Sequence, residues 1–371
     1  MRIAMAFSGG GVRATVFHLG VLARLAKSGH LASVQSLSTV SGGSLAAGLV
    51  LAANQYQWPT PMQYFRFVVP RIRQLLTSRD LQRVYVLSSL VRPWRLMSGR
   101  ARVLGDCLAR HWQIDANLAD LPHWPRWTIN ATCYETGKNF RFGRDIMGDY
   151  QTKYVQRPSF SLAHALAASA AVPGLIGPLV LRTSKHRWSE RADQTWRPIF
   201  PPHRRYHLWD GGVYDNLGVE SLYKPGVGLR DDCDFLLVSD ASRPLEVGRE
   251  RSRFKPAYVE ASMRLVDIAT DQIRSLRARM LIDHFNQHPG RGVYLRMGLD
   301  TTEPRRRMHA SGPVSLTRAE INQATSFETT LRRLRSSEFA RLFQHGLEVA
   351  DVTLGRYGSG NETSAQAIKV A

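Results

Sequence analysis

Hydrophobic positions in the N-terminal part of the chain alternate between short uninterrupted runs and a helical spacing. Residues 2–7 are mainly apolar and lead into a cluster of glycines, which predicts a buried strand. In residues 14–27, apolar side chains recur every three to four positions, which predicts a helix. Residues 34–40 predict a second strand, and the small residues of 43–56 predict a second helix. The chain therefore begins as alternating strands and helices.

Later segments continue this alternation. Residues 127–134 and 139–143 are rich in β-forming residues and are joined by "ETGK", which predicts a hairpin. A long amphipathic pattern over 257–285 predicts a helix. We also expect helices over 161–172, 316–335 and 338–354, strands over 234–242 and 292–298, and a strand followed by a glycine turn over 206–218.

This order of elements predicts an α/β fold with three layers, in which helices cover both faces of a mainly parallel sheet. The 371 residues are enough for one large domain. We expect residues 1–355 to form a single domain, with a largely helical insertion over 57–126 and a helical C-terminal part over 257–355. Residues 356–371 are polar and rich in small side chains, which predicts a flexible tail.

Composition narrows the class of protein. The three cysteines, Cys107, Cys133 and Cys233, are odd in number and far apart, which predicts neither a disulfide framework nor a zinc site. A cytoplasmic location fits this cysteine usage best. The N-terminus resembles a first strand rather than a signal peptide, and no apolar window is long enough for a transmembrane helix.

The insertion carries a concentrated positive charge. The chain has a formal net charge of +20, and nine arginines face a single acid, Asp80, between Arg66 and Arg102. Aromatic and aliphatic residues are interleaved with these arginines. Such a mixture is typical of a segment that contacts an anionic membrane surface, but a core-facing helix pair with solvated arginines would show it too. We expect peripheral membrane contact and no binding of nucleic acid.

The stretch "STVSGGS", residues 38–44, places Ser41 between a predicted strand and a predicted helix. This strand–turn–helix setting is the one in which a nucleophilic serine is exposed on a sharp bend, usually within G-x-S-x-G. Gly43 matches the later glycine and Gly42 supports the turn, but Thr39 stands at the earlier position. An ordinary serine N-cap remains the alternative.

Two further segments supply what a serine nucleophile needs. "SGGGVR" places glycine amides at a strand-to-helix junction, where Gly10 and Gly11 could donate to an oxyanion and Arg13 adds positive charge. The segment lacks the pattern of a nucleotide-binding loop. Far downstream, "WDGGVYDN" places Asp210 at the end of a strand, where a buried carboxylate can act as a base.

These segments, taken in order, resemble the patatin-like phospholipase family. "GGGVR" is similar to its oxyanion motif, "TVSGG" to its serine motif, "ASAAVPGLIGP" at 168–178 to its Ala/Ser-rich segment, and "DGG" at 210–212 to its aspartate motif. The resemblance covers roughly residues 3–240. It implies a patatin-like α/β/α fold and a lipid acyl hydrolase that needs no cofactor or metal. The residues implied are Ser41 as nucleophile, Asp210 as base, and Gly9, Gly10, Gly11 and Arg13 at the oxyanion. Thr39 departs from the family pattern, and we expect it to support the turns together with Gly42, Gly43, Gly211, Gly212 and Asn216.

Alternatives stay open at this point. The same dyad could serve an acyltransferase or a small-ester esterase, and a basic protein could bind membrane or nucleic acid with its serine idle. Asp215 is a second acid in the same turn as Asp210. His18, His164 and His207 allow a serine–histidine–aspartate triad, although a histidine is more often structural. The expected partner is a phospholipid or another acyl ester, and the sequence does not determine an oligomeric state.

Overall fold

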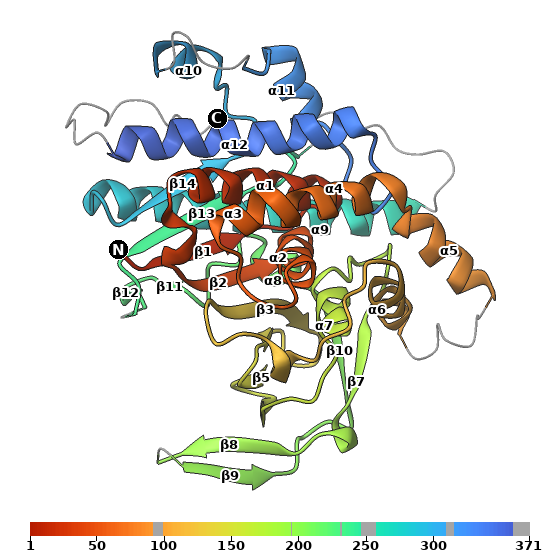
Figure 1. Ribbon diagram of the computed structural model, residues 1–371. Coiled ribbons are helices and arrows are strands. Elements are labelled where there is room, and N and C mark those ends of the chain that lie inside the picture. The colour runs from red at the N-terminus through yellow and green to blue at the C-terminus, as the bar shows by residue number, and fades with distance from the viewer. Residues whose placement is uncertain (92–98, 194, 231, 246–256, 309–314, 359–371) are drawn as a thin grey trace.

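The structure is a computed structural model, and it describes residues 1–91, 99–193, 195–230, 232–245, 257–308 and 315–358. A twelve-stranded sheet runs through these ranges, and its parallel centre has the order β14-β13-β1-β2-β3 (Figure 1). Almost every residue of these strands is buried, which explains their near-continuous apolar runs. The five strands are β1 (Ile3–Phe7), β2 (Val34–Val40), β3 (Arg126–Cys133), β13 (Phe235–Asp240) and β14 (Gly292–Arg296).

Antiparallel strands extend the sheet beyond β3. The predicted hairpin is confirmed, because β3 pairs antiparallel with β4 (Asn139–Phe142). The sequence analysis missed most of the strands that follow, because each is short and bounded by polar turns. They are β5 (Ile146–Asp149), β6 (Lys153–Gln156), β7 (Leu179–Arg182), β8 (Trp188–Ala192) and β9 (Thr195–Ile199), with β10 (Arg205–Asp210) pairing both β3 and β7 and a separate pair β11 (Tyr223–Lys224) and β12 (Gly228–Leu229).

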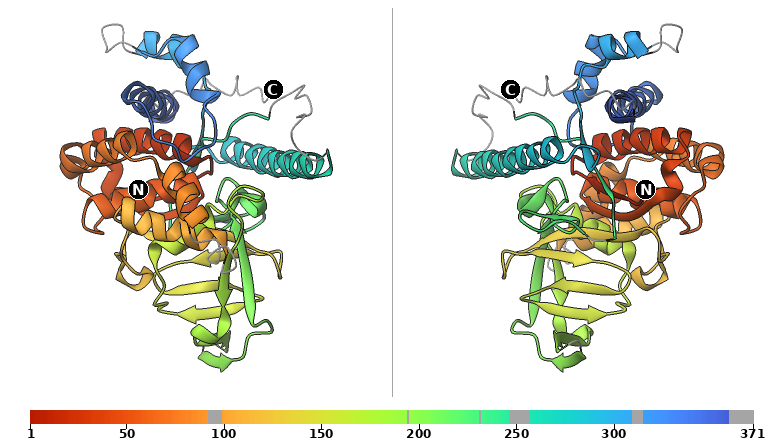
Figure 2. Two further views of the ribbon diagram at one scale, coloured as in Figure 1. Left: turned by 90° about the vertical axis from the view of Figure 1, so that its right-hand side faces the viewer. Right: turned by 90° about the vertical axis from the view of Figure 1, so that its left-hand side faces the viewer.

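Helices cover both sides of the central sheet, so the structure has the predicted three layers. Helices α1 (Gly11–Lys27) and α12 (Ser336–Gly358) lie on one side, and α9 (Ala257–Gln287) lies on the other (Figure 2). The first two pack closely because Gly20 and Gly346 face the partner backbone. A Cβ at either glycine would lie 2.0 Å from a carbonyl oxygen of the other helix. Helix α2 (Gly42–Ala53) packs against α1.

The insertion is largely helical, as predicted. None of the helices in the described ranges is both long and apolar enough to cross a membrane. Residues 92–98 of the basic stretch lie outside the described residues. The insertion contains α3 (Pro61–Gln63), a π-helical turn (Tyr64–Val68), α4 (Val69–Ser78), α5 (Leu81–Val91), α6 (Arg100–His111) and a 3₁₀ turn (Leu118–Asp120).

Two predicted helices are shorter than expected. Helix α7 (Leu162–Ser169) ends early because the backbone after it accepts hydrogen bonds from the end of β10. Helix α11 (Arg318–Thr325) ends because residues 326–335 run beside the glycine loop, residues 9–11, and the start of α1. Helix α12 extends to Gly358, into the tail predicted from 356, and the rest of that tail lies outside the described residues. The remaining elements are α8 (Gly212–Asp215), α10 (Thr302–Met308) and 3₁₀ turns at His30–Ser33 and Thr183–Lys185.

Candidate active site

The site forms where strands β2 and β10 meet along their common neighbour β3. Val40, the last residue of β2, pairs with Asn130, and Asp210, the last residue of β10, pairs with Ala131. These two partners are consecutive residues of β3, about 3.3 Å apart along the strand. The two strands run in opposite directions and end against each other. Ser41 therefore meets Asp210, although the two residues are far apart in sequence.

Ser41 occupies a strained backbone conformation between β2 and α2. Its φ of 49° and ψ of −117° are uncommon for a residue with a side chain. The bend brings α2 against the end of β1, where a Cβ at Gly43 would lie 2.6 Å from the Phe7 carbonyl oxygen. The Ser41 N–H donates to the Ser169 hydroxyl at 2.9 Å, so the bend is held from outside. The geometry is that of a nucleophile elbow.

The carboxylate of Asp210 accepts a hydrogen bond from the Gly212 N–H at 2.7 Å and interacts with the Ser41 side chain. Burial raises the pKa of Asp210 to about 6, although the interactions with Gly212 and Ser41 act to lower it. The backbone around it is fixed by α7 and the residues after it, because the Gly211 N–H donates to the Ser169 carbonyl at 3.2 Å. A carboxylate in this state can exchange a proton with a serine near neutral pH.

Thr39, which departs from the usual glycine, belongs to a chain of hydroxyl groups. The Trp127 indole N–H donates to the Thr39 hydroxyl at 2.9 Å, and this hydroxyl shares a hydrogen bond of 2.8 Å with Ser44. Ser44 in turn bonds the Ser169 hydroxyl at 2.9 Å. The chain ends at the N–H of Ser41. Thr39 therefore supports the elbow through its side chain, whereas the close backbone approach falls at Gly42 and Gly43.

The glycine loop lies beside Ser41, and a Cβ at Gly9 would lie 3.1 Å from the Ser41 Cβ. Gly10 precedes α1 with a φ of 140°, which a residue with a side chain rarely adopts. Within the described ranges, no backbone acceptor is found for the Gly10 or Gly11 N–H, whereas the Gly9 N–H donates to the Asn216 carbonyl at 3.2 Å. The loop thus leaves two amides available near the serine.

Arg13 is buried behind this loop. It donates to the Phe327 carbonyl at 2.7 Å, and its Nε has no hydrogen-bond partner within the part of the chain that the structure describes. Burial, followed by repulsion from Arg243, lowers the pKa of Arg13 to about 10. Asp240 acts in the opposite direction and raises the pKa of Arg13. Residues 326–335, predicted as helix, are needed here as carbonyl acceptors.

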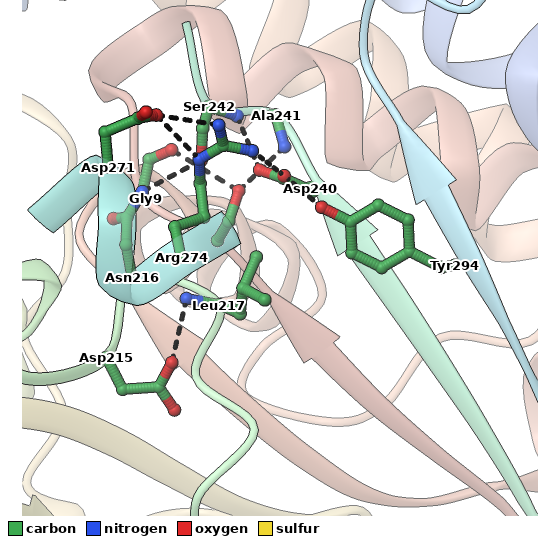
Figure 3. A network of polar contacts seen from close by, with 11 residues as sticks. Gly9, Asp215, Asn216, Leu217, Asp240, Ala241, Ser242, Asp271, Arg274 and Tyr294 are labelled. Atoms are coloured by element: carbon green, nitrogen blue, oxygen red, sulfur yellow. Dashed lines mark hydrogen bonds and ion pairs between the residues drawn. The ribbon is translucent and has the colours of Figure 1, made fainter. Parts of the chain in front are cut away.

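A cavity of about 330 Å³ connects these groups. Its lining includes Gly9, Gly10, Arg13, Ser41, Asp210, Gly212 and Asn216, so most of the predicted residues are brought together. The sequence analysis missed the opposite wall, formed by the segment after β13 and by α9. There Arg274 contacts Asp240 at 3.0 Å and Asp271 at 2.7 Å, and Tyr294 also donates to Asp240 (Figure 3).

Asn216 links the two walls. Its side-chain amide donates to the Ser242 hydroxyl at 2.8 Å, while its backbone carbonyl oxygen accepts from the Gly9 N–H. Asp215 points elsewhere: its carboxylate accepts from the N–H of Leu217 and Glu220 and lies 3.6 Å from Arg277 on α9. Asp210, not Asp215, is the acid that contacts the serine.

The three histidines have other contacts. His18 is fully buried, and burial lowers its pKa to about 4, so it is neutral at physiological pH. None of the three lines the cavity that contains the serine. Their partners include the Ser8 carbonyl and Ser239 hydroxyl for His18, Asp106 for His164 and Glu135 for His207.

A sheet with a serine elbow, a glycine loop and an aspartate at the adjoining strand end defines the class of patatin-like proteins. The family model for patatin-like phospholipase matches residues 5–223, and the chain belongs to this family. No curated protein matches the chain.

Solved structures with the same fold are distant in sequence. Human GIVD cytosolic phospholipase A2 is similar with a TM-score of 0.56 and 16% identity, over 96% of this chain and 59% of that one. The same human protein in complex with methyl gamma-linolenyl fluorophosphonate gives a TM-score of 0.55 and 14% identity, over 96% and 58%. The chain therefore spans about three fifths of the length of these neighbours, and the likeness establishes the fold.

Proposed function

We propose that this protein is a lipid acyl hydrolase of the phospholipase A or lysophospholipase type, acting through a Ser41–Asp210 dyad. The observation that carries the proposal is that Ser41 lies in one cavity with Asp210, a buried carboxylate that interacts with it and whose pKa is raised to about 6. A serine hydroxyl becomes a useful nucleophile only when a neighbouring group takes its proton. A carboxylate with this pKa is ionised at pH 7 and still basic enough to accept that proton.

In the proposed reaction, the Ser41 oxygen attacks the ester carbonyl while Asp210 accepts the hydroxyl proton. The tetrahedral intermediate collapses, the proton passes to the leaving alcohol, and an acyl-serine remains. A water molecule then attacks this ester, with Asp210 accepting its proton. The fatty acid leaves as Ser41 recovers a proton. Every step uses the same two side chains.

The oxyanion of this intermediate needs donors beside Ser41. The Gly10 and Gly11 amides, at the N-terminal end of α1, are suited to this role. Gly9 contributes by allowing close approach to the serine rather than by donating, because its N–H is already bonded to Asn216. Arg13 raises the positive potential around these amides.

Four arginines line the cavity together with three aspartates: Arg13, Arg243, Arg264 and Arg274, with Asp210, Asp267 and Asp271. Guanidinium groups bind phosphate oxygens through paired hydrogen bonds. A phospholipid headgroup is therefore the substrate group we propose for this cavity. The fluorophosphonate complex of the human neighbour also motivates the use of such a reagent here.

We further propose that the protein acts at a membrane surface as a single catalytic domain, from a cytoplasmic location. Helix α5 lies beside the loop at the cavity mouth, because the Tyr85 hydroxyl donates to the Ile176 carbonyl at 3.3 Å. Apolar side chains on both segments face solvent, and α5 belongs to the basic insertion, as contact with an anionic lipid surface requires. They are Val86, Leu87, Leu90 and Leu175.

The test is active-site labelling combined with product analysis. A fluorophosphonate probe should label the wild type and not Ser41→Ala, and phospholipid vesicles should release fatty acid only with the wild type. Ser36→Ala, which alters a buried serine on the same strand outside the cavity, serves as the matched control and should behave as the wild type. Equal labelling and turnover of Ser41→Ala would overturn the proposal.

A further inference from the structure

A second cavity lies at the other end of α7 from the dyad. It has a volume of about 470 Å³ and lies between α6, α7, β7 and β10, which are neighbours in Figure 1. Four permanently charged side chains line it: Arg102, Arg182, Lys185 and Arg205. No aspartate or glutamate does, within the described residues. The cavity therefore concentrates positive charge.

The arrangement of these cations is unfavourable without a partner. Arg182 on β7 and Arg205 on β10 are directly opposite each other in the antiparallel pair, so their side chains share one face. Like charges in this position destabilise a strand pair. No ion pair to a carboxylate is found for any of the four cations within the part of the chain that the structure describes. All four side chains reach solvent, which screens their repulsion, and a bound anion would neutralise them further.

Neutral groups in the same cavity suit an anion as well. Ser159 and Ser161 contribute hydroxyl groups, and the side chain of Ser161, the N-cap of α7, bonds no amide of its own helix. The positive end of the helix dipole adds to the potential. Phe160, Leu179 and Leu181 form apolar parts of the lining.

We propose that this cavity binds a phosphate-bearing anion, with the Arg182 and Arg205 guanidinium groups as its principal ligands. Guanidinium groups bind phosphate oxygens through paired hydrogen bonds, and two facing arginines can hold one phosphate between them. The phosphate belongs either to a small soluble anion or to the headgroup of a phosphomonoester lipid. The proposal is independent of the dyad chemistry, because binding is measured without turnover.

The decisive variant is R182Q/R205Q, which removes both facing charges and keeps hydrogen-bonding side chains. Its matched control is R191Q/R197Q on the β8–β9 hairpin, which removes the same charge outside the cavity. Circular dichroism and melting without added anion verify that both variants fold. Because the change relieves repulsion, R182Q/R205Q should melt no lower than the wild type.

Two assays separate the sources of phosphate. Thermal melting against increasing pyrophosphate detects a soluble anion, with a saturable rise of about 5 °C expected for the wild type. Flotation with vesicles of phosphatidylcholine containing phosphatidic acid detects a lipid headgroup, with phosphatidylglycerol at equal charge as the reference. In whichever assay responds, R182Q/R205Q should weaken binding by about tenfold or more, and the control should not.

A response to pyrophosphate that only R182Q/R205Q loses supports a soluble ligand. Preference for phosphatidic acid vesicles that only R182Q/R205Q loses supports a lipid headgroup. Equal losses in both variants mean nonspecific attraction to surface charge and overturn the proposal. Failure of the wild type to respond in both assays overturns it as well.

Discussion

The two ends of α7 face two cavities whose charged residues differ: arginines and aspartates line the first, and cations without acids line the second, within the described residues. At the C-terminal end, Ser169 and Ala171 bind the backbone of Ser41, Asp210 and Gly211, so this end holds the dyad in place. At the N-terminal end, the Ser161 side chain caps no amide and faces a cavity lined by cations. One short helix thus joins a region in which hydrogen bonds fix the backbone around Ser41 and Asp210 with a region whose cations have no acidic partner within the described residues.

The difference follows from burial. In the dyad cavity, Arg274 is mostly buried and is paired with Asp240 and Asp271, because an uncompensated buried charge is costly. In the second cavity, Arg182 and Arg205 reach solvent, which screens their repulsion at moderate cost. Two acids thus hold Arg274 in place, whereas the exposed cations of the second cavity, which have no ion pair within the described residues, keep their capacity to bind a ligand.

The largest effect should come from Asp210→Asn at the bonded end. Loss of the base should lower turnover by about a thousandfold or more. The same change should stabilise the fold by about 3 kcal/mol above pH 6, because the raised pKa of Asp210 makes its ionisation unfavourable in the folded state. That gain should disappear as pH falls toward 4. Turnover by the wild type should rise with pH through about 6, as Asp210 ionises.

Stopped assays of fatty-acid release and chemical denaturation between pH 4 and 8 measure both parts of this prediction. A variant with full turnover would disprove the role of Asp210 as base. A variant that is less stable than the wild type at pH 8 would instead show that the carboxylate mainly supports the fold.

Asp240→Asn tests whether pairing is required at the opposite wall of the dyad cavity. Burial acts to raise the pKa of Asp240, but Arg274 and the hydrogen bonds from Ser242 and Tyr294 outweigh it and hold the pKa below its ordinary value. The carboxylate therefore stabilises the fold above pH 4, and this contribution is lost as pH falls. We expect a loss on the order of 2–4 kcal/mol at pH 7 in denaturant melts. Unchanged stability would contradict this account of the network.

Ser169→Ala should have a smaller effect, on turnover rather than stability. Without the Ser169 hydroxyl the Ser41 N–H loses its acceptor, so kcat should fall by about tenfold while KM changes little. Ser44→Ala and Thr39→Val, one and two steps further along the hydroxyl chain, should give progressively smaller losses. Steady-state kinetics on one ester substrate gives the series, and equal losses at all three positions would contradict it.

The smallest effect should come from Ser161→Ala, the same substitution at the opposite end of α7. Since this hydroxyl caps no helix amide, the free energy of unfolding should change by about 0.5 kcal/mol or less, with turnover unchanged. Denaturant melts and the same kinetic assay measure both. A large loss would show that the two ends of α7 are more alike than their contacts indicate.

Local signals predicted the parts of the site that depend on local structure. The strand, turn and helix around Ser41, the glycine loop and the strand end at Asp210 all follow from residue spacing. The central sheet and its covering helices were predicted for the same reason. Thr39 could not be interpreted from the motif, because its role depends on Trp127, which lies on another strand.

Contacts between distant segments could not be predicted. Residues 326–335 have the composition of a helix, yet Phe327 and Thr330 serve as carbonyl acceptors for Arg13 and Val12. The apolar positions of the first half of α9 predicted a buried face, whereas Met263 and Val266 are more than a third exposed. The cavity at the N-terminal end of α7 depends on strand β7, which the sequence pattern did not reveal.

Strands β2 and β10 end against each other along β3, so the backbone register of β3 determines the distance between Ser41 and Asp210. The spacing between serine and aspartate is fixed by one peptide unit of β3, that between Asn130 and Ala131, and can change only in whole-residue steps. Inserting one residue there would move Ser41 and Asp210 about 3.3 Å further apart and turn the following side chains to the other face. An insertion at this point would therefore separate Ser41 from Asp210 without altering either residue.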